Sequence, residues 1–131
     1  MGKIMYEIYI QDGFSAAHNL RGYPGDCEHK HGHNWVVEVY IQCSQLDSLG
    51  MGVDFRKLKR QLSRIIKNLD HKDLNTLAVF KRKNPSCEHI AAYIYGRMKN
   101  KIAGRNIRVS KVRVCESPGC GVTYYPDTPP R

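Results

Sequence analysis

The chain has 131 residues, of which 41% are hydrophobic, and its 21 lysines and arginines outnumber 12 acidic residues to give a formal net charge of +9. This size and composition fit one globular domain over residues 1–131 and exclude a disordered chain. No apolar run approaches the ~20 residues of a membrane-spanning helix, and the N-terminus lacks the continuous apolar stretch of a signal peptide. We therefore expect a cytoplasmic protein that binds no membrane.

Five cysteines, at positions 27, 43, 87, 115 and 120, form no CxxC pair. An odd number without such pairs argues against a disulfide framework and against a zinc ribbon. The positive charge favours an anionic partner, but the lysines and arginines are spread along the chain and match no nucleic-acid-binding motif. We expect a solvated basic surface, an anionic small-molecule substrate and no nucleic acid. A basic nucleic-acid-binding module is the alternative from a different class.

Two β-strands are predicted in the first third of the chain. Residues 3–11 and 33–43 alternate apolar and polar side chains with a period of two, which is typical of strands. The residues between them are predicted to form a long connection. Long loops that carry reactive side chains are more often functional than not.

Two amphipathic helices follow, and each begins after a capping residue. Asp54 is the expected N-cap of a helix that runs to residue 69, and Ser86 is the expected N-cap of a helix over residues 87–102, ended by Gly104. The resulting order, ββααββ, predicts an α+β fold with an antiparallel sheet and two helices. The other predicted segments are a loop at 70–85, strands at 106–116 and 120–126, and a loose tail at 127–131.

The segment CEHKHGHNW, which begins at Cys27, is rich in side chains that bind metals. His31 and His33 share a face at the entry to the second strand, and Gly32 leaves room for a close approach. His18 is placed to reach the same region if the first two strands pair. Three histidines with one open position are typical of catalytic zinc. Cys27 either closes a structural zinc site as a fourth ligand or lies nearby as a base or nucleophile.

Further candidates lie elsewhere in the chain. Asp70 precedes His71, and its carboxylate would orient the imidazole if the two touch. Glu116 ends a strand, where its carboxylate can accept two N–H groups of a guanidine-like edge. Glu88 lies in the first turn of the second helix. Glu28 is either a surface charge or a second acid/base group beside the loop cysteine.

Together these residues resemble the family of 6-pyruvoyltetrahydropterin and 6-carboxytetrahydropterin synthases. The resemblance spans nearly the whole chain and rests on the histidine after FSAA, the CxxxHGHN stretch, GVDF, LDHKDLN, NPSCEHIA and the strand-terminal VCES. It implies the tunnelling fold, in which three ββααββ subunits close a β-barrel and two trimers stack as a homohexamer with active sites between subunits. The site residues that it implies are the zinc ligands His18, His31 and His33, the proton acceptor Cys27, the acid/base pair Asp70 and His71, and the pterin anchor Glu116, with Glu88, Ser86 and Cys87 beside it.

The spacing between Cys27 and His31 is similar to that of the carboxy-forming, queuosine-pathway branch. The resemblance thus implies a Zn²⁺-dependent lyase that converts 7,8-dihydroneopterin triphosphate to 6-carboxy-5,6,7,8-tetrahydropterin, acetaldehyde and triphosphate. Glu28 leaves a second reaction open, because a related branch uses a glutamate near this position to cleave dihydroneopterin phosphates to 6-hydroxymethyldihydropterin for folate synthesis. The same residues are also compatible with a 6-pyruvoyltetrahydropterin synthase and with a structural zinc protein.

Overall fold

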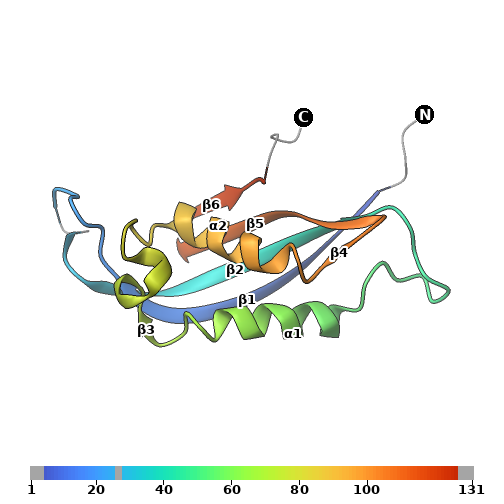
Figure 1. Ribbon diagram of the computed structural model, residues 1–131, viewed down its shortest axis with the longest axis horizontal. Coiled ribbons are helices and arrows are strands. Elements are labelled where there is room, and N and C mark those ends of the chain that lie inside the picture. The colour runs from blue at the N-terminus through green and yellow to red at the C-terminus, as the bar shows by residue number, and fades with distance from the viewer. Residues whose placement is uncertain (1–4, 26–27, 127–131) are drawn as a thin grey trace.

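The computed structural model describes residues 5–25 and 28–126, which form one six-stranded sheet and two α-helices (Figure 1). The strands lie in the order β3-β1-β2-β5-β4, and β6 pairs with β5. This arrangement confirms the predicted α+β fold with the order ββααββ for its long elements. The long elements are β1 (Tyr6–His18), β2 (His31–Cys43), α1 (Phe55–Ile66), α2 (Cys87–Met98), β5 (Ile107–Ser117) and β6 (Cys120–Tyr124), and the short strands are β3 (Lys72–Asp73) and β4 (Ala103–Gly104).

β1 and β2 form a long antiparallel pair in which His18 lies opposite His31. The predicted first strand, over residues 3–11, was too short, because the inward alternation continues through Phe14 to His18, both of which are buried. Residues 3 and 4 of that prediction lie outside the described residues. The connection between the strands therefore begins only after His18, and the histidine is held by the sheet.

Both predicted helices form, and both begin at the predicted caps. The Asp54 carboxylate accepts a hydrogen bond from the Arg56 N–H, and the Ser86 hydroxyl accepts one from the His89 N–H. These bonds satisfy backbone donors that have no partner inside a helix. The start of α2, which carries several predicted site residues, is thus fixed by its own cap.

Both helices end earlier than predicted, α1 at Ile66 and α2 at Met98. The apolar periodicity misled the prediction, because Leu69 and Ile102 lie beyond the helix ends and still bury their side chains. The predicted loop at 70–85 also holds regular structure. It contains β3, which pairs in parallel with two residues of β1, and the short 3₁₀ helices η2 (Leu74–Thr76) and η3 (Ala78–Phe80).

An extra residue interrupts the regular alternation of β5. The register between β2 and β5 slips between Tyr40, which lies opposite Lys111, and Ile41, which lies opposite Val109, so Ser110 is an extra residue of β5. Such a bulge shifts the alternation by one position. Val109 and Val112 are consequently both buried, although they lie three residues apart.

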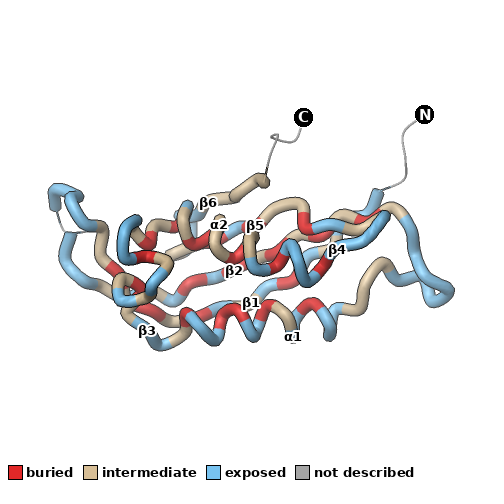
Figure 2. Tube along the Cα trace, viewed as in Figure 1, coloured by how far each residue is buried: buried red, intermediate tan, exposed pale blue. Residues whose placement is uncertain are grey.

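The core lies between the sheet and the two helices (Figure 2). The face of β2 that carries Trp35 is buried. α1 and α2 bury their apolar sides in the same cluster, so both helices cover one face of the sheet. Phe55 is an exception to the predicted apolar side of α1, since it is 57% exposed. The buried residues of β2 are Trp35, Val37, Val39, Ile41 and Cys43.

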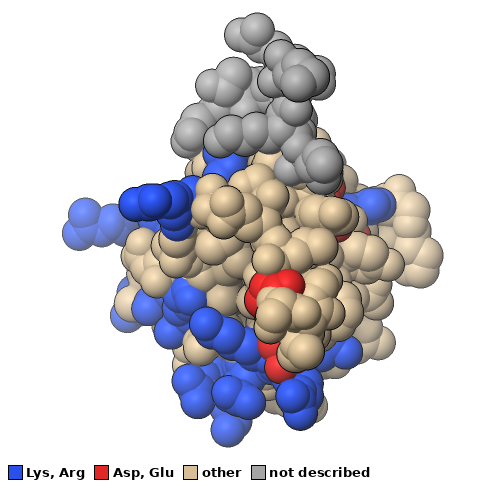
Figure 3. Space-filling model, turned by 90° about the vertical axis from the view of Figure 1, so that its right-hand side faces the viewer, with Lys and Arg blue, Asp and Glu red and all other residues tan. Residues whose placement is uncertain are grey.

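Lysine and arginine side chains gather in the lower part of the surface shown in Figure 3, with few acidic side chains among them. α1 contributes to this basic character, because it carries five lysines and arginines and no acidic residue. Among the described residues, no helix has the length and apolar character required to cross a membrane.

Candidate metal centre

Three histidines meet at one end of the β1–β2 pair. His18 lies opposite His31, and His33 is two residues further along β2, so all three side chains share the inward face of the sheet. The centroids of the three rings lie between 4.7 and 5.4 Å apart. The structure thus brings the three predicted metal ligands together.

Glu116, near the end of β5, completes a cluster of four side chains. Its Oε2 lies 2.8 Å from His33 Nε2, and His18 Nε2 lies 3.1 Å from His31 Nε2. One ligand atom from each of the four residues lies within 4.8 Å of the others. Among the residues that the structure describes, this group is the one arranged to hold a metal ion.

Backbone carbonyls orient two of the three rings. His18 Nδ1 lies 2.7 Å from the carbonyl oxygen of Pro85, and His31 Nδ1 lies 2.7 Å from that of His29. A carbonyl oxygen only accepts, so each Nδ1 carries the hydrogen and each Nε2 keeps a lone pair that faces the cluster. Burial lowers the pKa of His18, which favours the neutral ring that a metal requires.

The environment of His33 fits a cation. Its buried Nε2 makes no hydrogen bond within the described part of the chain, and its close approach to Glu116 lacks hydrogen-bond geometry. Trp35 packs edge-on against His18 and His33, with centroid distances of 4.8 and 5.3 Å, and closes the inner side of the cluster with an apolar ring. Lone pairs and a carboxylate that converge without donors suit a divalent metal ion.

The cluster opens into a pocket of about 380 Å³. His18 and Glu116 line one part of it, and Ser86, Cys87 and Glu88 at the start of α2 line another. The Cys87 thiol lies 3.9 Å from Glu116 Oε1. Burial, with the negative charges of Glu116 and Glu88, raises the pKa of Cys87 to about 12. This raised pKa favours the neutral thiol of Cys87 at physiological pH.

Asp70 and His71 form a separate pair. Asp70 Oδ2 lies 3.0 Å from His71 Nδ1, and Asp70 Oδ1 accepts a hydrogen bond from the Ser15 N–H. That backbone hydrogen bond, together with the contact to His71, lowers the pKa of Asp70. The ionised carboxylate can thus orient the imidazole and stabilise its charged form.

The backbone and exposure of His71 are also unusual. Its φ of 57° lies in the left-handed region, which non-glycine residues rarely adopt. Residues held in such sparsely populated conformations cluster at functional sites. Its side chain is 81% exposed, and the pair does not belong to the four-residue cluster of its own chain.

Two more candidates lie in the connection between β1 and β2. Cys27 lies outside the described residues, so its position beside the cluster stays a prediction. Glu28 is exposed, which suits a surface charge and leaves its chemical role as a prediction. His29 is exposed too, and only its backbone carbonyl contributes to the cluster.

Sequence reasoning did not place Glu116 at the metal cluster. A usable signal was present in β5, because Val112 and Val114 are buried and the same alternation turns Glu116 toward the inward face. The roles of the Pro85 and His29 carbonyls had no such signal, since any residue type supplies a carbonyl.

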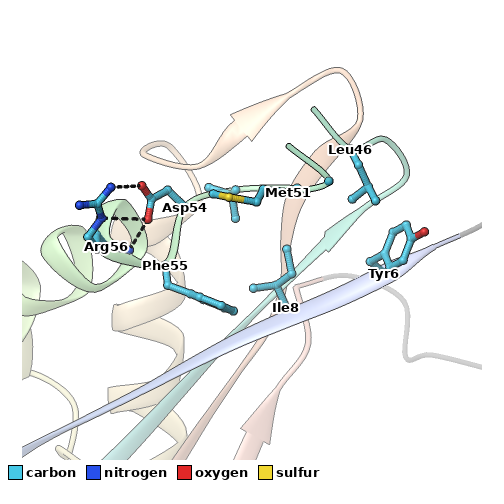
Figure 4. Close-up of a pocket in the computed structure, with 10 residues that line it drawn as sticks. Tyr6, Ile8, Leu46, Met51, Asp54, Phe55 and Arg56 are labelled. Atoms are coloured by element: carbon cyan, nitrogen blue, oxygen red, sulfur yellow. Dashed lines mark hydrogen bonds and ion pairs between the residues drawn. The ribbon is translucent and has the colours of Figure 1, made fainter. Parts of the chain in front are cut away.

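A second pocket, of about 510 Å³, shares no lining residue with the one beside the cluster (Figure 4). It lies at the start of α1, and Ile8, Met51 and Phe55 are among the apolar side chains that line it. Its charged residues, Asp54 and Arg56, pair with each other at the helix cap. Among the described residues, no histidine or cysteine lines this second pocket, so they offer none of the predicted metal or acid/base chemistry there.

Comparisons with known proteins agree with this architecture. The profile of the family described as 6-pyruvoyl tetrahydropterin synthase matches residues 7–127. The chain is 36% identical, over 100 residues, to the 6-carboxy-5,6,7,8-tetrahydropterin synthase of Synechocystis, covering 72% of this chain and 76% of that one. It is 30% identical, over 115 residues, to the dihydroneopterin monophosphate aldolase of Pyrococcus furiosus, covering 88% and 93%. The structure of Caenorhabditis elegans 6-pyruvoyl tetrahydropterin synthase superposes with a TM-score of 0.84 at 27% identity, covering 97% of this chain and 100% of that one.

The ββααββ fold and the histidine–carboxylate cluster define a tunnelling-fold protein with a candidate metal centre. The chain belongs to the 6-pyruvoyl tetrahydropterin synthase family. It is accordingly an enzyme, and its activity is of the pterin synthase and lyase type.

Proposed function

We propose that the chain acts in the cytoplasm as a single-domain, zinc-dependent lyase of the carboxy-forming branch. It converts 7,8-dihydroneopterin triphosphate and water to 6-carboxy-5,6,7,8-tetrahydropterin, acetaldehyde and triphosphate. The observation that supports this proposal is the metal cluster that opens into a pocket lined by Glu116 and the start of α2. The similarity to the Synechocystis synthase and the basic surface, which attracts a triphosphate, add support.

The residues of the cluster and pocket divide into two groups. His18, His31 and His33 hold the zinc ion, which supplies Lewis acidity to the side-chain oxygens of the substrate and makes the adjacent C–H bonds more acidic. Glu116 binds the amino-amide edge of the pterin ring by paired hydrogen bonds. The remaining lining groups at the start of α2, which hold the ring beside Glu116, are Ser86, Cys87 and Glu88.

We assign proton transfer to Cys27 and His71. Cys27 accepts a proton from the substrate side chain, and His71 is the companion acid/base, oriented by Asp70. Because His71 is exposed and lies outside the cluster of its own chain, we propose that it serves the pocket of a neighbouring subunit.

A second reaction is favoured by a specific observation. The relative from Pyrococcus furiosus is named a dihydroneopterin monophosphate aldolase. Glu28 directly follows Cys27, and its exposed side chain is free to approach a substrate. The alternative activity is therefore side-chain cleavage to 6-hydroxymethyldihydropterin, with Glu28 as the base.

Product analysis after incubation with dihydroneopterin triphosphate tests both reactions. If each base serves one reaction, Cys27→Ala abolishes the carboxytetrahydropterin and leaves some hydroxymethyl product, whereas Glu28→Ala does the reverse. Chromatography of the products of both variants and of the unmodified enzyme measures the ratio. An unchanged ratio in Glu28→Ala would show that Glu28 is only a surface charge, and failure of the unmodified enzyme to form either product would refute the proposed function.

We further propose that the active enzyme is a homohexamer, a dimer of trimers. Within the described residues, β3 pairs with β1 only at Ala16 and Ala17, so most of the outer edge of β1 is unpaired, as is the outer edge of β6. Long unpaired edges attract further strands, and a closed barrel removes them.

Light scattering at micromolar concentration is expected to give a mass close to six chains. Pairing of the free edge of β1 with that of β6 in the next subunit would close a ring of three chains, and stacking of two such rings would give six. A purely monomeric mass would contradict the proposed oligomer and would leave the Asp70–His71 pair without a pocket to serve.

A further inference from the structure

The Glu116 carboxylate faces two sites at once. Its Oε2 approaches His33 Nε2 at 2.8 Å, and its Oε1 faces the Cys87 thiol, which lines the neighbouring pocket. In the metal cluster it contributes the fourth ligand atom, beside three imidazole nitrogens. In the pocket it is the group proposed to hold the pterin edge. The metal and the pterin edge therefore compete for the same carboxylate oxygens of Glu116.

We propose that Glu116 is an exchangeable fourth ligand of the metal. In the resting enzyme its carboxylate closes the coordination sphere that the three histidines leave open. When the amino-amide edge of a pterin enters the pocket, its two N–H groups draw both carboxylate oxygens away from the metal. The fourth position thus opens only when a pterin ring is bound. This inference rests on the proposed pterin chemistry and deepens it.

The donor set supports the closed resting state. Three neutral histidines leave the full charge of a dication in place, and an adjacent carboxylate compensates part of it. A fourth protein ligand is also what distinguishes closed tetrahedral sites from open ones. Among the described residues, His33 Nε2 has no hydrogen-bond partner, and Glu116 Oε2 lies beside it. One bound metal ion would be coordinated by both atoms.

The position of Glu116 supports its release. The register between β5 and β6 slips between Cys115 and Ser117, so Glu116 has no cross-strand partner on β6. Its side chain is 35% exposed and opens on the pocket. A planar pair of N–H donors binds a carboxylate through both oxygens. Such binding competes with the metal, and by thermodynamic linkage each ligand weakens the hold of the other on Glu116.

Cobalt(II) in the full-length protein provides the test, because its visible absorption reports the number and type of ligands. Bound cobalt is counted first, at one ion per chain. Glu116→Gln is expected to change the absorption of the resting protein and to weaken metal binding by about tenfold or more. Glu88→Gln is the matched control, because Glu88 lines the same pocket and does not belong to the cluster. It is expected to leave the spectrum unchanged.

The opening of the fourth position on pterin binding is tested on the unmodified protein with isocytosine. This compound carries the amino-amide edge of a pterin without its second ring or side chain. Isocytosine at millimolar concentration is expected to shift the cobalt spectrum, whereas uracil, which lacks the amino group, is not. A resting spectrum that Glu116→Gln leaves unchanged would overturn the fourth-ligand assignment. A spectrum that isocytosine leaves unchanged, or that uracil shifts equally, would overturn the proposed release of Glu116 from the metal. Either failure leaves the proposed function standing if the zinc enzyme still forms product, and absence of bound metal would overturn both.

Discussion

Replacing His31 by alanine is expected to remove the metal and leave the fold intact. His31 Nε2 is one of three imidazole nitrogens that converge on the cluster, and its ring is fixed by a hydrogen bond to the His29 carbonyl. Loss of one of the three histidine ligands leaves too few imidazole nitrogens to retain zinc at this site. We expect less than about a tenth of the metal content and at least about a hundredfold less activity, because removal of even a supporting partner costs 10–100-fold.

His29→Ala is the matched control for this variant. The His29 side chain is exposed and only its backbone carbonyl orients His31, so alanine preserves the relevant contact. Metal analysis of the two purified variants and their circular dichroism spectra give the comparison. Full metal content in His31→Ala would refute the ligand assignment, and loss of the folded spectrum would show that the structure itself requires the metal, as in a structural zinc protein.

The sequence predicts the fold well where one periodicity dominates. β2 was predicted as a strand from its alternation, and every second residue from Trp35 to Cys43 is buried. The helix starts were predicted from Asp54 and Ser86, because a cap is a local interaction between neighbours. The errors lie where distant pairing decides. β1 continues to His18 because it pairs with β2 as far as His31.

The residues of the candidate site were also predictable where a local pattern places them, and not where pairing between distant segments does. His31 and His33 are two residues apart, so their shared face is a local property of a strand. The addition of His18 required only the assumption that the first two strands pair. Glu116 comes from a strand more than eighty residues further along, and only the order β1-β2-β5 places it beside His33. The separation of Asp70 and His71 from the cluster has the same origin in three-dimensional topology.

Trp35 belongs to the buried core and also contacts the metal cluster. It is 1% exposed, stacks on Phe14 at a centroid distance of 5.8 Å, and packs edge-on against His18 and His33. Its indole N–H donates a hydrogen bond to the carbonyl oxygen of Ala16. The ring thus supports two of the three histidines, and the packing of the core contributes to the geometry of the site.

Trp35→Ala is therefore expected to lower the free energy of unfolding of the metal-free protein by about 3–5 kcal/mol, the range for truncating a buried aromatic residue. Trp35→Phe keeps a ring in the cavity and loses the indole N–H, so we expect a smaller loss of about 1–2 kcal/mol. Phe55→Ala is the control, because Phe55 is 57% exposed and should cost less than about 1 kcal/mol. Denaturant unfolding followed by circular dichroism, at equal chain concentration, measures all three, since the chain has a single tryptophan and its fluorescence is lost in two of them. If Trp35→Ala destabilises the protein no more than Phe55→Ala, the ring does not support the histidines as the packing indicates.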